Sequence, residues 1–201
     1  MVIKNKKTSF LFPKLVVSGD IENFTDIKQD LIDWIYKFKE KNSGISKISN
    51  RGGWQSESKK IFVSEGFDKF AEYIVPSITE LLKSYEIEKE IRIVQMWLNV
   101  NEPNSYNVCH RHPGSDLSGV LWIKQTSESG RFVFDDIDNV DQILTTNINP
   151  QYLKEKNMLP EIVPEYQDGT VILFPSMLTH RVEINETDED RISISFNLKI
   201  T

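Results

Sequence analysis

The sequence RISISFNLKI, residues 191–200, alternates between polar and apolar side chains along its whole length. Side chains in a β-strand point to opposite faces in turn, so this alternation predicts a strand with one apolar and one polar face. The apolar face needs a hydrophobic layer, which amphipathic helices earlier in the chain can supply. The polar face, which begins with Arg191 and Ser193, is then expected to point into the interior of a barrel.

Arg191 is the most demanding residue of that polar face. A guanidinium group that faces inward is costly unless it is paired, and no acidic residue shares its face of the strand. The carboxylate of a ligand is the expected partner, because guanidinium can hold it through two parallel hydrogen bonds. Ser193 can add a hydroxyl group to the same carboxylate. The alternative is a surface strand whose polar face meets water, which is common in antiparallel sheets.

The three histidines of the chain, His110, His112 and His180, predict a metal site. Histidine is the commonest metal ligand, and residues two apart in an extended segment share a face, so His110 and His112 can reach one ion. His180 follows the strand-like run GTVILFP at residues 169–175 and precedes Arg191 by 11 residues, which favours an inward-facing Arg191. Three ligands on one side of an ion leave other positions open, as in catalytic metal sites.

Two helical regions are expected in the first 90 residues. A helix of about 20 residues, capped by Asp20 or Ser18, should end near Asn42. A second helical region runs from about Glu65 to Tyr85 and contains Pro76, which predicts either a kink or the first turn of a separate helix.

Strand-like segments dominate the rest of the chain. Residues 10–17 predict an edge strand, because Pro13 cannot donate to a ladder. A period of two over short segments bounded by turn residues predicts further strands at residues 91–100, 118–124, 130–135, 169–174 and 191–200. Residues 136–167 are polar and predict a long excursion between strands. The expected fold class is α+β, mostly β: a small barrel or jelly roll with the N-terminal helices packed on one sheet.

Composition places limits on the function. A length of 201 residues suits one domain, with residues 1–90 as mainly helical support and residues 91–201 as the β core. The net charge of −6 argues against a general nucleic-acid binder. The single cysteine, Cys109, favours a reducing compartment and is expected to point away from His110 as a small packed residue. No signal peptide or membrane-spanning run is evident, so a cytoplasmic protein is expected, and a homodimer stays open.

Three stretches carry a resemblance to a known family. The segment GTVILFPSMLTHRVEIN at residues 169–185, followed by EDRISISFN at residues 189–197, resembles the C-terminal signature of iron(II)- and 2-oxoglutarate-dependent oxygenases. The segments NVCHRHPGSDLSGVLW at residues 107–122 and NRGGWQS at residues 50–56 resemble a subgroup of these oxygenases in marine bacteria and their phages. The resemblance covers roughly residues 48–200, and for a phage protein the expected location is the host cytoplasm.

This resemblance implies a double-stranded β-helix, the cofactors Fe(2+) and 2-oxoglutarate, and the co-substrate O2. By position, His110, His112 and His180 would be the metal ligands, and Arg191 and Ser193 would bind the far carboxylate of 2-oxoglutarate. The implied reaction hydroxylates a substrate and releases succinate and CO2. The primary substrate is not implied, because a shared fold does not fix what enters the site.

The second metal position departs from the family pattern. His112 stands where the family has aspartate, so the site carries one more unit of positive charge. Asp116 is the nearby carboxylate, and it could join the metal or replace a histidine. The spacing of His110, His112 and Asp116 also resembles a cupin motif, which would imply a metal-binding protein or enzyme that does not use 2-oxoglutarate. The pair Arg191 and Ser193 favours the oxygenase, because a cupin has no need of it.

Two further roles stay open. Trp54, in a glycine-containing loop, could cover the substrate or simply pack in its loop. The group that hydrogen-bonds the C1 carboxylate of 2-oxoglutarate is expected among the polar residues before and beside the histidines: Gln95, Trp97, Asn99, Asn101 and Asn107.

Overall fold

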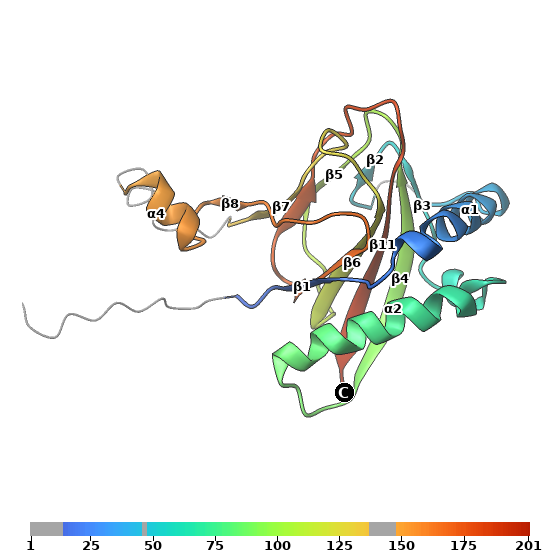
Figure 1. The fold of residues 1–201 in the computed structure, drawn as a ribbon, viewed down its shortest axis with the longest axis horizontal. Coiled ribbons are helices and arrows are strands. Elements are labelled where there is room, and N and C mark those ends of the chain that lie inside the picture. The colour runs from blue at the N-terminus through green and yellow to red at the C-terminus, as the bar shows by residue number, and fades with distance from the viewer. Residues whose placement is uncertain (1–13, 46–47, 137–147) are drawn as a thin grey trace, which may run out of the picture.

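Two antiparallel sheets form the body of the protein in the computed structural model, which describes residues 14–45, 48–136 and 148–201 (Figure 1). The larger sheet has the strand order β1-β9-β6-β11-β4-β3, and the smaller has the order β2-β5-β10-β7-β8. Strands that follow one another in the chain therefore alternate between the sheets over much of the fold, as in a double-stranded β-helix. The predicted fold class is confirmed.

The larger sheet contains the long strands, and its members are β1 (Val17–Asp20), β3 (Trp54–Gln55), β4 (Ile91–Asn101), β6 (Leu117–Lys124), β9 (Thr170–Pro175) and β11 (Arg191–Ile200). The smaller sheet is made of short strands, β2 (Asn50–Arg51), β5 (Tyr106–His110), β7 (Phe132–Asp135), β8 (Glu161–Ile162) and β10 (His180–Val182). The helices are α1 (Thr25–Lys41), α2 (Phe67–Leu82) and α4 (Pro150–Glu155), with the 3-10 turns η1 (Ile61–Val63) and η2 (Lys83–Tyr85).

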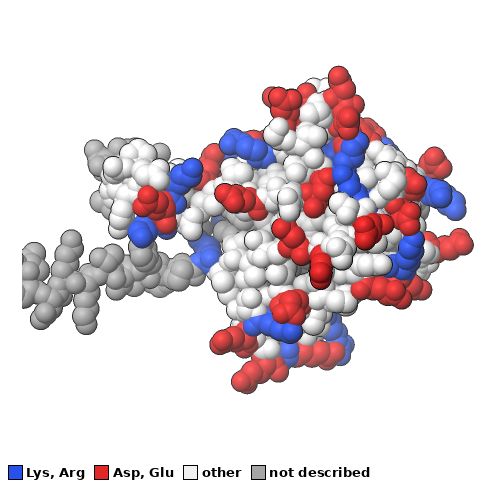
Figure 2. Space-filling view, in the orientation of Figure 1, with Lys and Arg blue, Asp and Glu red and all other residues white. Residues whose placement is uncertain are grey.

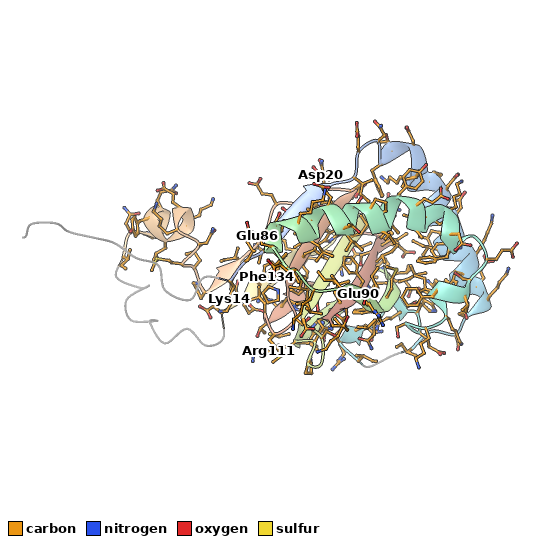
Figure 3. The ribbon with its side chains drawn as sticks, turned by 90° about the horizontal axis from the view of Figure 1, so that it is seen from below. Lys14, Asp20, Glu86, Glu90, Arg111 and Phe134 are labelled. Atoms are coloured by element: carbon orange, nitrogen blue, oxygen red, sulfur yellow. The ribbon has the colours of Figure 1, made fainter. Side chains whose placement is uncertain are left out.

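The main hydrophobic core lies between α1, α2 and the outer face of the larger sheet. The apolar residues of β11 from Ile192 to Leu198 are buried in it, together with Leu31 of α1 and Ile74 of α2. Each fully buried side chain of this kind stabilises the fold by about 1.5–3 kcal/mol. Figure 3 shows α2 crossing the strands on this side of the sheet. The apolar face of residues 191–200 therefore packs on the helices, as predicted.

A second apolar cluster lies on the inner faces of the sheets. It consists of alternate residues from β6, β7 and β9. Its members are Val120, Trp122, Phe132, Phe134, Ile172 and Phe174. This cluster forms the apolar wall of the barrel interior.

All five strands predicted after residue 90 are present, with their ends shifted by two residues or fewer. The first helix begins at Thr25, after Phe24, so neither Asp20 nor Ser18 caps it. Both residues lie in β1, which pairs with β9, and the carboxylate of Asp20 accepts a hydrogen bond from the Thr170 hydroxyl at 2.5 Å. The residues predicted to cap the helix are thus used in a strand pairing with a distant part of the sequence.

The second helical region is one α-helix that contains Pro76 and then tightens into η2. Of the predicted edge strand at 10–17, residues 10–13 lie outside the described part, residues 14–16 are not in a strand, and Val17 begins β1. The excursion at 136–167 holds α4 and β8, and its residues 137–147 lie outside the described part.

The surface carries charges of both signs. Figure 2 shows acidic and basic side chains interspersed over the visible face. Within the described residues, the helices are too short or too polar to cross a membrane.

Candidate active site

The three histidines come together at one end of the space between the sheets. His110 ends β5 and His180 begins β10, and these two residues are direct partners in the antiparallel pairing of the strands. His112 lies two residues beyond β5, where its backbone N–H donates to the carbonyl of Ser176 at 2.9 Å. Of the pair His110 and His112, His110 alone is therefore in a strand, and the loop that follows brings His112 to the same place.

The ring nitrogens are arranged to accept an ion. One ligand nitrogen from each histidine lies within 4.8 Å of the others, and the Nε2 atoms of His112 and His180 are 3.2 Å apart. The Nδ1 atoms of His110 and His180 lie 2.7 Å and 2.9 Å from the carbonyl oxygens of Val108 and Leu178. Because a carbonyl only accepts, both Nδ1 atoms must donate, which leaves both Nε2 lone pairs free for a metal.

Burial keeps these rings neutral. It lowers the pKa of His112 to about 4 and that of His180 to about 3, and the neighbouring His110 acts in the same direction. Burial also lowers the pKa of His110. Neutral imidazole is the form that binds metals, so the three residues are in the ligand state at pH 7. The donor set fits a divalent transition metal such as iron(II).

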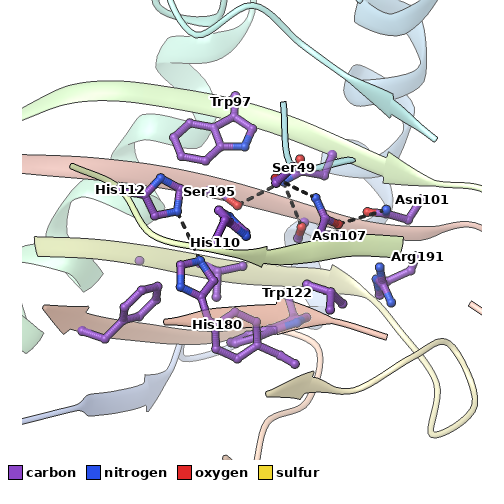
Figure 4. A pocket seen from close by; sticks show the side chains of 17 residues that line it. Ser49, Trp97, Asn101, Asn107, His110, His112, Trp122, His180, Arg191 and Ser195 are labelled. Carbon is purple, nitrogen blue, oxygen red and sulfur yellow. Dashed lines mark hydrogen bonds between the residues drawn. The ribbon is translucent and has the colours of Figure 1, made fainter. Parts of the chain in front are cut away.

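A pocket runs from the histidines along the barrel interior to Arg191, and both Arg191 and Ser193 line it (Figure 4). One side of the pocket is polar and comes from β4, β5 and β11. The other side is formed by Trp122, Phe132 and Phe174 of the inner apolar cluster. The polar face of β11 thus points into the barrel, as predicted.

Arg191 is buried without a carboxylate partner among the described residues. The residue is only 3% exposed. Its Nη1 donates to the carbonyl groups of Ser129, Gly130 and Glu183. Its Nη2 is buried and has no hydrogen-bond partner within the described part of the chain. Burial lowers the pKa of Arg191 to about 10. An unpaired interior cation is costly, so this end of the pocket fits an anionic group.

Ser193 lies beside Arg191 with a free proton to donate. Its Oγ accepts a hydrogen bond from Asn99 Nδ2 at 3.3 Å, and the same Nδ2 lies 3.0 Å from Ser195 Oγ. Because Asn99 supplies the proton in that contact, the Ser193 hydroxyl remains able to donate into the pocket.

The five residues that the sequence offers as hydrogen-bond partners of the C1 carboxylate divide into two groups. Trp97, Asn99, Asn101 and Asn107 line the pocket, whereas Gln95 does not; Gln95 Oε1 accepts from Asn197 Nδ2 at 2.7 Å. Asn101 Nδ2 donates to Asn107 Oδ1 at 3.3 Å, and Asn107 Nδ2 donates to the hydroxyl of Ser49 at 3.1 Å. Ser49 was not foreseen, because its place depends on the pairing of β2 with β5.

Asp116 is not part of the histidine cluster. Its carboxylate accepts from the backbone N–H of Ile200 at 2.8 Å and from Lys199 Nζ at 3.2 Å. The expectation that Asp116 could join or replace a metal ligand is therefore not met, since the carboxylate is used to hold the end of β11. This also removes the acidic ligand of the cupin interpretation.

Two other residues of the sequence analysis lie away from the pocket. Cys109 faces outward as expected, but it is exposed rather than packed, with Sγ 3.5 Å from Asp135 Oδ2. Trp54 packs edge-on against Phe38 of α1 and donates to the carbonyl of Asn42 at 3.0 Å. Trp54 therefore packs on the main hydrophobic core beside α1 and does not line the pocket.

Comparisons with known proteins agree with this arrangement. A family model described as "Putative 2OG-Fe(II) oxygenase" matches residues 95–197, just over half of the chain. This range contains all three histidines, Arg191 and Ser193. A comparison with curated protein sequences finds no match.

Solved structures show the same fold. A Pseudomonas putida prolyl-4-hydroxylase aligns with a TM-score of 0.62 and 13% identity over 92% of both chains. SnoK, a non-heme α-ketoglutarate-dependent carbocyclase from nogalamycin biosynthesis, aligns with a TM-score of 0.66 and 12% identity, over 92% of this chain and 79% of its own. HygX from Streptomyces hygroscopicus, with nickel and 2-oxoglutarate bound, aligns with a TM-score of 0.60 and 13% identity, over 94% of this chain and 83% of its own.

The structural alignments establish the fold, and the family match covers the strands that carry the site. The chain belongs to the iron(II)- and 2-oxoglutarate-dependent oxygenase family.

Proposed function

We propose that His110, His112 and His180 bind the iron(II) of this oxygenase, and that Arg191 and Ser193 bind the far carboxylate of 2-oxoglutarate. The enzyme would hydroxylate a substrate that is still to be identified, with release of succinate and CO2. One observation carries the proposal: a single pocket has metal-ligand nitrogens at one end and a buried, unpaired guanidinium nitrogen at the other.

The charge of the site supports a dianionic co-substrate. Three neutral histidines leave a divalent ion with its full charge of +2, whereas an aspartate ligand would reduce it by one. 2-Oxoglutarate brings two negative charges, one for the metal and one for Arg191. The ion and Arg191 together carry a charge of +3, and a bound dicarboxylate lowers this to +1, which is favourable in an interior of low dielectric constant.

The residues of the chain orient and shield the reactants. Ser193 and Arg191 fix the far carboxylate, and the Nδ1–carbonyl hydrogen bonds fix the rings of His110 and His180. Trp122 and Phe174 are buried and line this part of the pocket, where their apolar rings would exclude water. When bound, the iron with 2-oxoglutarate and O2 supplies the oxidising chemistry of the family.

The class of substrate and the location are also part of the proposal. The negative net charge supports a substrate other than nucleic acid, and the single exposed cysteine supports a reducing compartment, which we place in the cytoplasm.

The test uses purified protein with iron(II), ascorbate and oxygen, and measures loss of 2-oxoglutarate and formation of succinate. Mn(II) serves as a redox-silent substitute for calorimetric titration with 2-oxoglutarate. Protein that neither consumes nor binds 2-oxoglutarate contradicts the proposal. His180→Ala should abolish metal binding, whereas the control Asp116→Asn should keep one metal per chain, because Asp116 contacts β11 and not the histidines.

A further inference from the structure

The guanidinium group of Arg191 is held from one side only. Nη1 donates to three backbone carbonyl groups, those of Ser129, Gly130 and Glu183. Nη2 has no partner within the described residues. The protein therefore uses up one terminal nitrogen of the guanidinium group on its own backbone and leaves the other for a ligand. Figure 4 shows Arg191 at the end of the pocket opposite the histidines.

Two of the three carbonyl groups come from one tight turn at residues 126–130, between β6 and β7. The side chain of Ser129 closes this turn twice: its Oγ donates to the Thr126 carbonyl at 2.8 Å and accepts from the Thr126 N–H at 3.0 Å. The backbone N–H of Ser129 also donates to the Thr126 carbonyl at 3.1 Å. Ser129 is buried, with 2% of its surface exposed. The turn is thus a fixed support and not a loose loop.

Gly130 is the residue that lets this support approach Arg191. Its φ of +90° lies in the region that favours glycine. A Cβ at this position would lie 2.6 Å from Arg191 Nη1 and 2.2 Å from the Glu183 carbonyl oxygen. Both contacts are too short, and the carbonyl belongs to backbone that cannot simply rotate away. Any side chain here would therefore displace the guanidinium group.

We propose that Gly130 and the turn at residues 126–130 position Arg191 and so set the selectivity of the enzyme for its co-substrate. This inference rests on the proposed function. The backbone carbonyl groups hold the cation at one distance from the histidines. Under the proposed function, a five-carbon 2-oxo dicarboxylate is the ligand that reaches both the metal and Arg191. The support is then expected to discriminate against four-carbon and six-carbon homologues, because a fixed donor cannot follow a displaced carboxylate.

The experiment titrates Mn(II)-loaded protein with 2-oxoglutarate, oxaloacetate, 2-oxoadipate and 2-oxobutyrate, the last of which lacks the far carboxylate. For Gly130→Ala we expect 2-oxoglutarate affinity to fall by about tenfold or more, which is the effect of misplacing one charged hydrogen bond. The ratio of the affinity for 2-oxoglutarate to the affinities for oxaloacetate and 2-oxoadipate should decrease. Affinities for 2-oxobutyrate and Mn(II) should stay within about threefold, since neither contacts Arg191.

Gly169→Ala is the matched control. Gly169 has the same φ of +90°, and a Cβ there would lie 2.7 Å from the side chain of Phe24, to which all three of its nearest atoms belong. This variant should lose thermal stability but keep the 2-oxoglutarate preference. If both glycine variants lose stability and neither changes the preference, Gly130 is only structural and the inference is wrong.

The Arg191→Met variant distinguishes a failure of the proposed function from a failure of the positioning role of Gly130. If Arg191→Met binds 2-oxoglutarate normally, the proposed function fails at this residue. If Arg191→Met binds weakly but Gly130→Ala binds normally, only the positioning role fails. In the double variant, the glycine substitution should add no further loss. Should Gly130→Ala not fold, Ser129→Ala, which loosens the turn but keeps the glycine, must weaken 2-oxoglutarate binding, and unchanged binding overturns the inference.

Discussion

Replacing Arg191 with methionine should weaken 2-oxoglutarate binding by two orders of magnitude. Methionine is unbranched and fills a similar space without charge. Burial lowers the pKa of Arg191 from an ordinary value above 12 to about 10. That change corresponds to a destabilisation of the charged form by about 3 kcal/mol, which a carboxylate beside Nη2 would offset. At ~1.4 kcal/mol per tenfold in affinity, the expected loss is roughly 100- to 300-fold, within the 2–5 kcal/mol typical of a broken buried charge pair.

The assay is calorimetric titration of Mn(II)-loaded protein with 2-oxoglutarate. Arg92→Met is the matched control, since it removes the same charge from an exposed residue of β4 that pairs with Glu90. The control should bind like the wild type, which excludes a general effect of net charge. The Mn(II) affinity of both variants should be unchanged. An Arg191→Met variant that binds 2-oxoglutarate within threefold of the wild type, a limit of about 0.7 kcal/mol, would refute the assignment.

Three further outcomes are expected. His112→Asp should keep one metal per chain and raise Mn(II) affinity, because a carboxylate restores a negative charge; weaker binding than in the wild type, measured by calorimetry, would show that the pocket is shaped for imidazole. Addition of Mn(II) at 100 times its dissociation constant should stabilise the protein by about 2.7 kcal/mol in urea unfolding, and a His180→Ala variant should lose this gain. Gly119→Ala should cost about 1–3 kcal/mol by overpacking, because its Cβ would lie 2.4 Å from the ring of Phe196; a loss under about 0.5 kcal/mol in the same assay, the level of an ordinary surface substitution, would contradict the packing described for β6 and β11.

The strand at residues 191–200 could be predicted because one continuous segment contains the full alternation of polar and apolar residues that defines its two faces. Its apolar residues require the helices, and its polar residues require the pocket. The short strands that carry two of the histidines could not be predicted in this way. β10 has three residues and an irregular register with β5 after His180, so too few residues remain to establish a period.

Other features depended on contacts between distant residues. Asp20 and Ser18 are good helix caps by residue type, but their pairing with β9 is about 150 residues away in sequence. Asp116 has a spacing suited to a metal ligand, and only the position of Ile200 and Lys199 reveals its other use. The groups that hold Arg191 are backbone carbonyls, which every residue has, so their role cannot be predicted from side chains. The glycine at position 130 is the one sequence signal of this contact among the residues of the turn.

The pairing of His110 with His180 gives metal loading a role in folding. The two residues lie 70 positions apart in the chain and face each other across β5 and β10. An ion held by both would close this long loop as a covalent cross-link does, and the entropy lost on closing it would be recovered in the binding energy. A strand of three residues has few backbone hydrogen bonds of its own. The pairing of β5 with β10 is therefore expected to open first when iron is scarce, so that metal supply would govern the lifetime of the protein as well as its turnover.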